Sequence, residues 1–222
     1  MKAGIRNSAL AALALFVQCA ALGWLIWRYE SIVRFGTETR FRCTAYDPYD
    51  PLRGRYLRTT VRERCSNFVG CSAEDFSAGQ HGDFGYREAG LYAKLEPSTN
   101  GLWCVAAVAK APQPDGGLWV KPSRSRVEHS VGWGDKGKDE SYKDFEKRRG
   151  ASPLIATVGL PDQLFVNERI APEAEKVLQK ATSAKGAGAV AVYRAMGGEI
   201  VITDIEINGK SVAALARAAL HE

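Results

Sequence analysis

The sequence has few histidines, the residue that enzymes use most often as a general acid or base. It contains three histidines among 222 residues, and His81, His129 and His221 are scattered along the chain. Its glycine pairs lack the rest of a Walker loop or a dinucleotide-binding motif. It also has no internal repeat and no low-complexity segment. We therefore expect no nucleotide cofactor, no bound metal and no catalytic grouping of a familiar kind.

The sequence also lacks a concentrated basic stripe. Lysine and arginine exceed aspartate and glutamate to give a formal net charge of +5, with a pI near 9.0, but the basic residues are dispersed. No motif pairs a basic stripe with stacking aromatic residues, which argues against nucleic-acid binding. A modest basic excess keeps a domain soluble, and it also favours weak attraction to anionic lipids or cell-wall polymers.

Charge is absent altogether from residues 9–27, where Gln18 is the one clearly polar side chain. A helix of this length spans roughly 28 Å, which is close to the thickness of a bilayer's hydrocarbon core. The sequence therefore predicts a cytoplasmic head at residues 1–8, a transmembrane anchor at 9–27 and one exported domain at 28–222.

The flanks of the apolar segment indicate its orientation. Lys2 and Arg6 precede it, and a short basic head before a long body favours the head in the cytoplasm. Trp24 and Trp27 lie at its far end, as in an aromatic belt. A cleaved signal peptide is the alternative, but the run is longer than the usual 7–15 residues of a cleavable apolar region and ends in Trp-Leu-Ile-Trp.

Four cysteines lie beyond the anchor: Cys43, Cys65, Cys71 and Cys104. An even number in an exported domain favours two disulfides, and four cysteines allow three pairings. The short segment between Cys65 and Cys71 favours a 65–71 bridge together with 43–104. A zinc site is the first alternative, although five intervening residues are more than the usual two to four. Free thiols are the second alternative, if the body is cytoplasmic.

The body is expected to be mainly β (α+β), with one helix packed on a sheet. Alternation at residues 56–63 places Leu57, Thr59 and Val61 on one face of a strand. Further strands are predicted at residues 91–95, 102–108, 118–120, 154–158, 164–166, 189–194 and 200–207. A Gly-Leu-Pro-Asp turn is expected between 158 and 164, and Asn208-Gly209 predicts a two-residue reversal.

Two helices are predicted in the C-terminal part. Pro172 suits a first helical position, and an apolar stripe follows until Gly186. A shorter helix is expected at residues 212–220. The charged segment 121–150 has few core residues, and we expect an exposed excursion with one helical turn near 142–148. It is either a partner-binding arm or a tolerated insertion.

A stiff, charged segment follows the anchor. Two Asp-Pro pairs, beginning at Asp47 and Asp50, favour extended or turn backbone, and Gly54 permits a sharp entry into the strand that starts at Tyr56. The two acids either satisfy backbone amides and pair with a neighbouring arginine such as Arg53, or they contact a partner. The segment is therefore a candidate contact site.

This segment, shortly beyond an N-terminal anchor, resembles the GDYXXLXY family of membrane-anchored bacterial proteins. Gly54 and Tyr56 match the first and third positions of the naming motif. Arg55, Thr59 and Val61 replace its Asp, Leu and final Tyr. Further segments that fit the family are residues 91–95, 164–168 and 205–209.

The resemblance implies an anchored, exported domain and supplies no catalytic residue or cofactor. We expect a bacterial inner-membrane protein with a cytoplasmic N-terminus and a periplasmic body. Its expected role is that of a non-enzymatic accessory to another membrane protein, such as a multi-pass protein. Gln18 and the small residues Ala14, Ala20, Ala21 and Gly23 suit packing against a partner helix. The sequence indicates no small-molecule ligand.

The alternative function is an envelope hydrolase with an unrecognised active site. Its best candidates for catalysis are Arg53, Tyr56 and Glu168. A concave cluster of these three side chains would favour the hydrolase, and a flat surface would favour the accessory.

Overall fold

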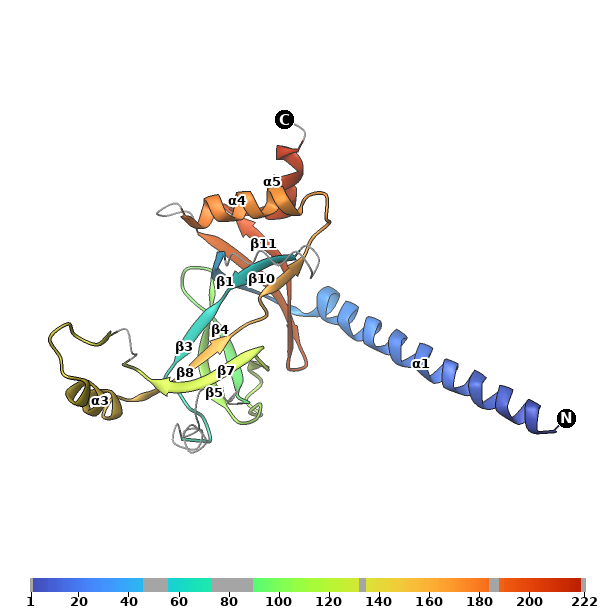
Figure 1. The fold of residues 1–222 in the computed structure, drawn as a ribbon, viewed down its shortest axis with the longest axis horizontal. Helices are drawn as coiled ribbons and strands as arrows, with labels where there is room; N and C mark the ends of the chain where they lie inside the picture. The colour runs from blue at the N-terminus through green and yellow to red at the C-terminus, as the bar shows by residue number, and fades with distance from the viewer. Residues whose placement is uncertain (1, 46–55, 73–89, 132–134, 184–187, 221–222) are drawn as a thin grey trace.

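The computed structural model describes residues 2–45, 56–72, 90–131, 135–183 and 188–220. These residues form twelve strands and four helices, as drawn in Figure 1. The helices are α1 (Lys2–Phe35), α3 (Tyr142–Gly150), α4 (Ala171–Ser183) and α5 (Val212–Ala219). The strands are β1 (Thr37–Ala45), β2 (Tyr56–Thr60), β3 (Arg62–Cys65), β4 (Tyr92–Pro97), β5 (Trp103–Ala109), β6 (Leu118–Val120), β7 (Arg124–His129), β8 (Leu154–Gly159), β9 (Gln163–Phe165), β10 (Ala189–Met196), β11 (Glu199–Ile207) and β12 (Lys210–Ser211). The expectation of a mainly β fold is confirmed.

The largest sheet has six strands in the order β12-β11-β10-β1-β2-β9. Its centre is β1, which pairs antiparallel with β10 and with β2. Phe41 of β1 and Tyr193 of β10 are both fully buried, with their rings edge to face at 5.8 Å. Strand β1 was not among the predicted strands, although Thr39, Phe41 and Cys43 alternate with arginines and are buried.

Helices α4 and α5 cover one face of this sheet (Figure 1). Ala174, Leu178 and Ala181 of α4 are buried, so the predicted apolar stripe faces the sheet. The predicted reversal at Asn208-Gly209 is also confirmed. Both residues have positive φ, 51° and 75°, as a two-residue hairpin turn requires. They connect β11 to β12, which leads directly into α5.

Two smaller sheets complete the body, with the orders β3-β8-β7 and β5-β4-β6. The β4–β5 hairpin is formed as predicted. An isolated parallel bridge between Phe68 and Val108 lies beside it. The segment that follows β3 is thereby held along β5, since the Val69 amide donates to the Val108 carbonyl at 2.9 Å.

Strands β2 and β3 pair with β9 and β8 in one continuous register. Tyr56 lies opposite Phe165, and six residues further on Arg62 lies opposite Gly159. The expected turn between β8 and β9 is therefore wrong, because the chain continues in the same direction through it. Pro161 explains the break between the two strands, since proline has no N–H to donate to a β ladder.

The ladder of hydrogen bonds is interrupted only at Pro161. On either side of this residue, the Leu160 amide donates to the Val61 carbonyl at 3.3 Å, and the Thr59 amide donates to the Asp162 carbonyl at 2.9 Å. The Pro161 carbonyl instead accepts a hydrogen bond from the buried Tyr193 hydroxyl at 2.9 Å. The break in the ladder is thus tied to the core of the six-stranded sheet.

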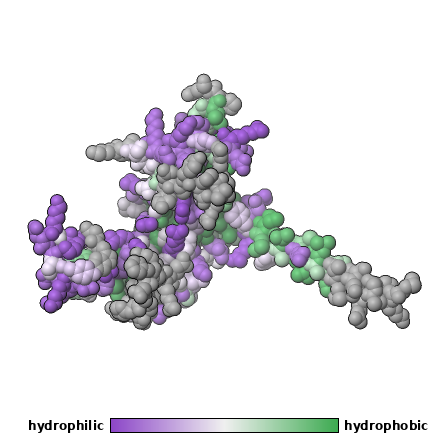
Figure 2. Space-filling view, viewed as in Figure 1, coloured by the Kyte–Doolittle hydropathy of each residue, from purple (hydrophilic) through white to green (hydrophobic). Residues whose placement is uncertain are grey.

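Helix α1 leaves the body as a single rod of 34 residues (Figure 1). The candidate membrane span is Ala12–Phe35, which contains an unburied window apolar enough to cross a membrane; a signal sequence has the same properties. Figure 2 shows apolar residues along the protruding helix and hydrophilic residues over α3 and α4. The end of α1 contacts the body through the buried Ile32 and through an ion pair from Arg28 to Glu199 at 2.8 Å.

The segment 121–150 is more ordered than an exposed excursion. Its first part forms β7, which pairs with all of β8 and buries Val127. Its last part forms α3 over nine residues rather than one turn, and Phe145 is fully buried. The expectation was wrong for β7 because its long-range pairing with β8 buries Val127, which no local pattern indicated.

Candidate functional site

The predicted contact segment lies mostly outside the described residues, which include neither Asp47 and Asp50 nor Arg53 and Gly54. Tyr56 is half-buried at the start of β2, and its ring lies 6.1 Å from that of Phe165 on β9.

Glu168, the third residue proposed for a hydrolase, is exposed in the turn before α4. Within the described part of the chain no hydrogen bond or ion pair joins it to Tyr56.

The predicted disulfides are wrong. All five cysteines lie in the described part of the chain, and each is a free thiol. The Cys71 thiol lies 3.4 Å from the Val69 carbonyl. Cys43 is buried in the six-stranded sheet, whereas Cys104 lies on a different sheet.

The short segment between Cys65 and Cys71 suggested a bridge between these two residues. The contact between β3 and β5 instead brings Cys65 near Cys104. Burial raises the pKa of the Cys65 thiol, and the neighbouring Cys104 raises it further. Burial also raises the pKa of Cys43, to about 12, so this thiol stays protonated. These cysteines therefore behave as packed thiols.

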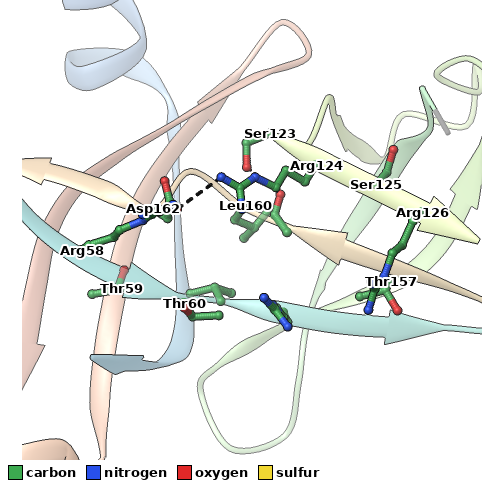
Figure 3. Close-up of a pocket in the computed structure, with 13 residues that line it drawn as sticks. Arg58, Thr59, Thr60, Ser123, Arg124, Ser125, Arg126, Thr157, Leu160 and Asp162 are labelled. Carbon is green, nitrogen blue, oxygen red and sulfur yellow. Dashed lines mark hydrogen bonds and ion pairs between the residues drawn. The ribbon is translucent and has the colours of Figure 1, made fainter. Parts of the chain in front are cut away.

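The described residues line a pocket of about 390 Å³ beside Pro161, where the ribbon formed by β2–β3 and β8–β9 is interrupted. Four arginines line it, and we call it the arginine pocket: Arg58 from β2, Arg62 from β3, and Arg124 and Arg126 from β7. Figure 3 shows β7 and the β2–β3 strands on either side of β8. The basic site thus combines the consecutive strands β2 and β3 with β7, which is remote from them in sequence.

Strand periodicity explains why the arginines share the pocket. Arg58 and Arg62 are four residues apart across the β2–β3 junction, and Arg124 and Arg126 are two apart on β7. Even spacings place side chains on one face of a strand. Between the two arginine pairs lies β8, which contributes Thr157 and Gly159 to the lining.

Acidic groups neutralise only part of this charge. The Asp162 carboxylate accepts from Arg58 at 3.0 Å and lies 4.0 Å from Arg124 (Figure 3). Arg126 pairs with Glu128 at 3.0 Å, and Glu128 also accepts from the Thr157 hydroxyl. Asp162 is the single carboxylate in the lining, so the described pocket wall keeps a positive excess.

The chemistry of the lining suits binding. Guanidinium groups are permanently charged hydrogen-bond donors and do not act as bases at neutral pH. The one lining carboxylate, Asp162, is shared by two arginines. Elsewhere in the described residues, no group of three or more His, Cys, Asp and Glu side chains forms a candidate metal site.

The sequence contained part of the signal for this pocket. Alternation places Arg58 and Arg62 on the solvent side of one strand, as the half-buried and exposed side chains confirm. Arg124 and Arg126 were assigned to an excursion, and their own alternation in β7 was the signal that could have placed them. Only the pairing of β7 with β8 unites the two pairs.

The fold and the site define a mainly β body on an N-terminal helix that is able to span a membrane. More particularly, the chain belongs to the GDYXXLXY family, since the family model described as GDYXXLXY protein matches residues 18–205. No curated protein and no solved structure matches the chain.

Proposed function

We propose that this protein is a single-pass, membrane-anchored envelope protein whose body is a non-enzymatic accessory to another membrane protein. The observation that carries the proposal is the unbroken course of α1 from its apolar part into the body. Ile32 is buried against the body, and Arg28 pairs with Glu199. A helix fixed in this way holds the body at the membrane surface, where a membrane-embedded partner lies.

The proposed topology has the N-terminus in the cytoplasm of a bacterium and the body in the periplasm. The basic residues Lys2 and Arg6 before the apolar run support it. Trp24 and Trp27, whose rings lie 5.2 Å apart, fit the membrane–water interface at the periplasmic end of the anchor. Intact mass of the protein purified from membranes distinguishes the anchor from a cleaved signal sequence.

The partner contact is assigned to one side of the anchor. Ala14, Gln18 and Ala21 follow one another at helical spacings of four and three residues, so they share a face. A small–polar–small face lets another helix approach closely and hydrogen-bond to Gln18. All three side chains are exposed in the structure, and Ala12, which is also exposed, lies on the opposite side of the helix.

The test is a crosslinking pull-down of the full-length protein from its native membrane, compared with Ala21→Leu and Ala12→Leu. The two variants carry the same substitution on opposite faces of one helix. We expect Ala21→Leu to reduce recovery of a specific membrane partner about tenfold, and Ala12→Leu to leave it unchanged, because a bulky side chain blocks close helix approach only on the contact face.

A version lacking residues 1–28 is the second arm of this experiment. Loss of the partner with the anchor supports a contact in the membrane, whereas retention moves the contact to the β body. Recovery of no specific partner from any version contradicts the accessory role and makes a search for hydrolase activity the next step.

A further inference from the structure

The arginine pocket carries more positive charge than its fold requires. Arg62 is exposed and forms no ion pair with any described residue, and Arg124 is 64 % exposed at 4.0 Å from its nearest carboxylate. The guanidinium groups of Arg62 and Arg124 share the pocket with those of Arg58 and Arg126, so these positive charges repel one another. An anion that binds among them relieves the repulsion. Structural ion pairing explains Arg58 with Asp162 and Arg126 with Glu128, but it does not explain Arg62 or the distant placement of Arg124.

The shape of the guanidinium group narrows the class of ligand. Its planar fork of N–H donors binds phosphate and carboxylate oxygens in pairs. The hydroxyl of Thr60 also lines the pocket and makes no hydrogen bond within the described residues, so it is available as a further donor to an oxyanion. Donors that converge from β2, β3 and β7 suit a tetrahedral phosphate with several oxygens better than a planar carboxylate.

The rest of the lining points to an organic ligand. Val61 and Leu160 line the pocket but are only 3 % and 2 % exposed and belong to the hydrophobic core, so its accessible apolar surface comes from the aliphatic stems of the arginines and the methyl groups of the threonines. A volume of about 390 Å³ lies within the range of small-molecule sites. A bare inorganic ion leaves most of that volume and the apolar part unused.

We infer that the arginine pocket binds an organic phosphate, with the phosphate held by Arg62 and Arg124 and the organic part in the rest of the pocket, against the aliphatic stems of the arginines. A soluble phosphate ester and the phosphate headgroup of an anionic lipid share this chemistry. The inference concerns the pocket alone and does not depend on the proposed role of the anchor.

The first experiment is isothermal titration of the full-length protein in maltoside micelles, which contain no phosphate. The probes are glucose 1-phosphate and sn-glycerol 3-phosphate, with glucose, inorganic phosphate and citrate as controls. We expect the phosphate esters to bind, glucose not to bind, and inorganic phosphate and citrate to bind at least about tenfold more weakly than the esters. Affinity falls as salt rises from about 0.15 M to 1 M, because exposed charges are screened.

The matched variants are Arg62→Gln, Arg124→Gln and Arg217→Gln. Each removes one positive charge, but Arg217 lies exposed on α5, outside the pocket lining. We expect the first two to weaken binding about tenfold each and Arg217→Gln to leave the affinity unchanged, because only the first two lose a charged hydrogen bond to phosphate. Near-UV circular dichroism checks that all three variants are folded.

The second arm separates the two sources of phosphate. The protein is placed in nanodiscs of phosphatidylcholine with or without about one-third phosphatidylglycerol, and glucose 1-phosphate is titrated again. If the pocket takes a lipid headgroup, phosphatidylglycerol weakens binding of the ester in the wild type but has no effect in Arg62→Gln. If it takes a soluble ester, both nanodiscs give the same affinity. Either result supports the inference.

Three results overturn the inference. The first is absence of binding to every phosphate ester at millimolar concentration. The second is equal loss of affinity in Arg62→Gln, Arg124→Gln and Arg217→Gln, which would indicate a diffuse charge effect. The third is binding of a poly-glutamate peptide at the pocket arginines without any binding of the esters, which would make the site a surface for acidic proteins. None of these results bears on the pull-down experiment.

Discussion

At the scale of single residues, Gly36 determines how the anchor joins the body. Its amide donates to the Ile32 carbonyl at 2.9 Å and closes the last turn of α1 before β1 begins. A Cβ atom at this position would overlap the Ile32 carbonyl and lie 3.1 Å from the Ala195 amide nitrogen on β10. The helix therefore approaches the sheet at a distance that only glycine allows.

Replacing this glycine is expected to weaken the joint. Gly36→Ala should destabilise the protein by about 1–3 kcal/mol, because backbone atoms on both sides must move to accept the methyl group. Gly150→Ala is the matched control, since nothing lies within 4 Å of its added Cβ. Thermal unfolding of both variants in micelles measures the difference, and equal melting temperatures would contradict the close approach.

The free thiols lead to a second prediction at this scale. Cys71 and Cys104 are partly exposed, whereas Cys43 and Cys65 are buried. Cys71 and Cys104 should react with a maleimide in the native protein at pH 8, and Cys43 and Cys65 only after unfolding. Peptide mass spectrometry of the labelled protein gives the order, and the predicted 65–71 and 43–104 bridges would instead leave all four unlabelled without reductant.

Alkaline pH provides a separate check on Cys43. Its pKa is raised by burial from 9.0 to about 12, so the folded state binds a proton that the unfolded state releases above pH 9. This contribution to stability is complete below pH 9 and is lost as the pH rises toward about 12. The same burial explains why the native thiol is unreactive.

At the scale of elements, α3 is stabilised at its start by polar contacts. Ser141 is its N-cap and accepts from the Asp144 amide at 3.2 Å. Glu140, just before the cap, accepts two hydrogen bonds from Arg148, both at 2.9 Å. The Arg148 guanidinium also lies over the ring of the buried Phe145, 5.4 Å from its centroid.

This helix should unfold locally in acid before the rest of the body. Arg148 is the main cause that lowers the pKa of Glu140 from 4.5 to about 2. A lowered folded-state pKa gives a contribution that is present above pH 4.5 and is lost as the pH falls toward about 2. Hydrogen exchange of residues 141–150 between pH 5 and 2.5 measures it, with Glu140→Gln expected to remove the pH dependence. Unchanged protection of α3 in the wild type across this range would contradict the prediction.

At the scale of the whole molecule, the body is organised around one long antiparallel ribbon. Its β2 and β9 ends belong to the six-stranded sheet, and its β3 and β8 ends belong to the β3-β8-β7 sheet. The break at Pro161 lies between the two, and the arginine pocket opens there. A binding site at this junction would respond to changes in either sheet, whereas the anchor is attached to the β10–β11 side.

Local patterns predicted much of this fold. The α4 stripe, the Asn208-Gly209 reversal and the hairpins of β4–β5 and β10–β11 are all encoded within about twenty residues of sequence, and each is confirmed. The β1 strand and β7 had the same alternation of buried and exposed residues but were not identified. Arginines occupy the alternate positions of both strands, and the charge of segment 121–150, which contains β7, led to the expectation of an exposed excursion.

The sequence by itself determined an apolar N-terminal helix able to span a membrane, a mainly β body and membership of the GDYXXLXY family. The helix and the strand content follow from composition and short-range periodicity, and the family from sequence resemblance; none of these depends on which strands pair. Tertiary structure alone decided that Cys65 lies near Cys104, that the chain runs straight through Pro161, and that Arg62 and Arg124 line one pocket. Each depends on pairing between segments far apart in the chain, where the register of the strands selects the neighbours and no local pattern specifies that register.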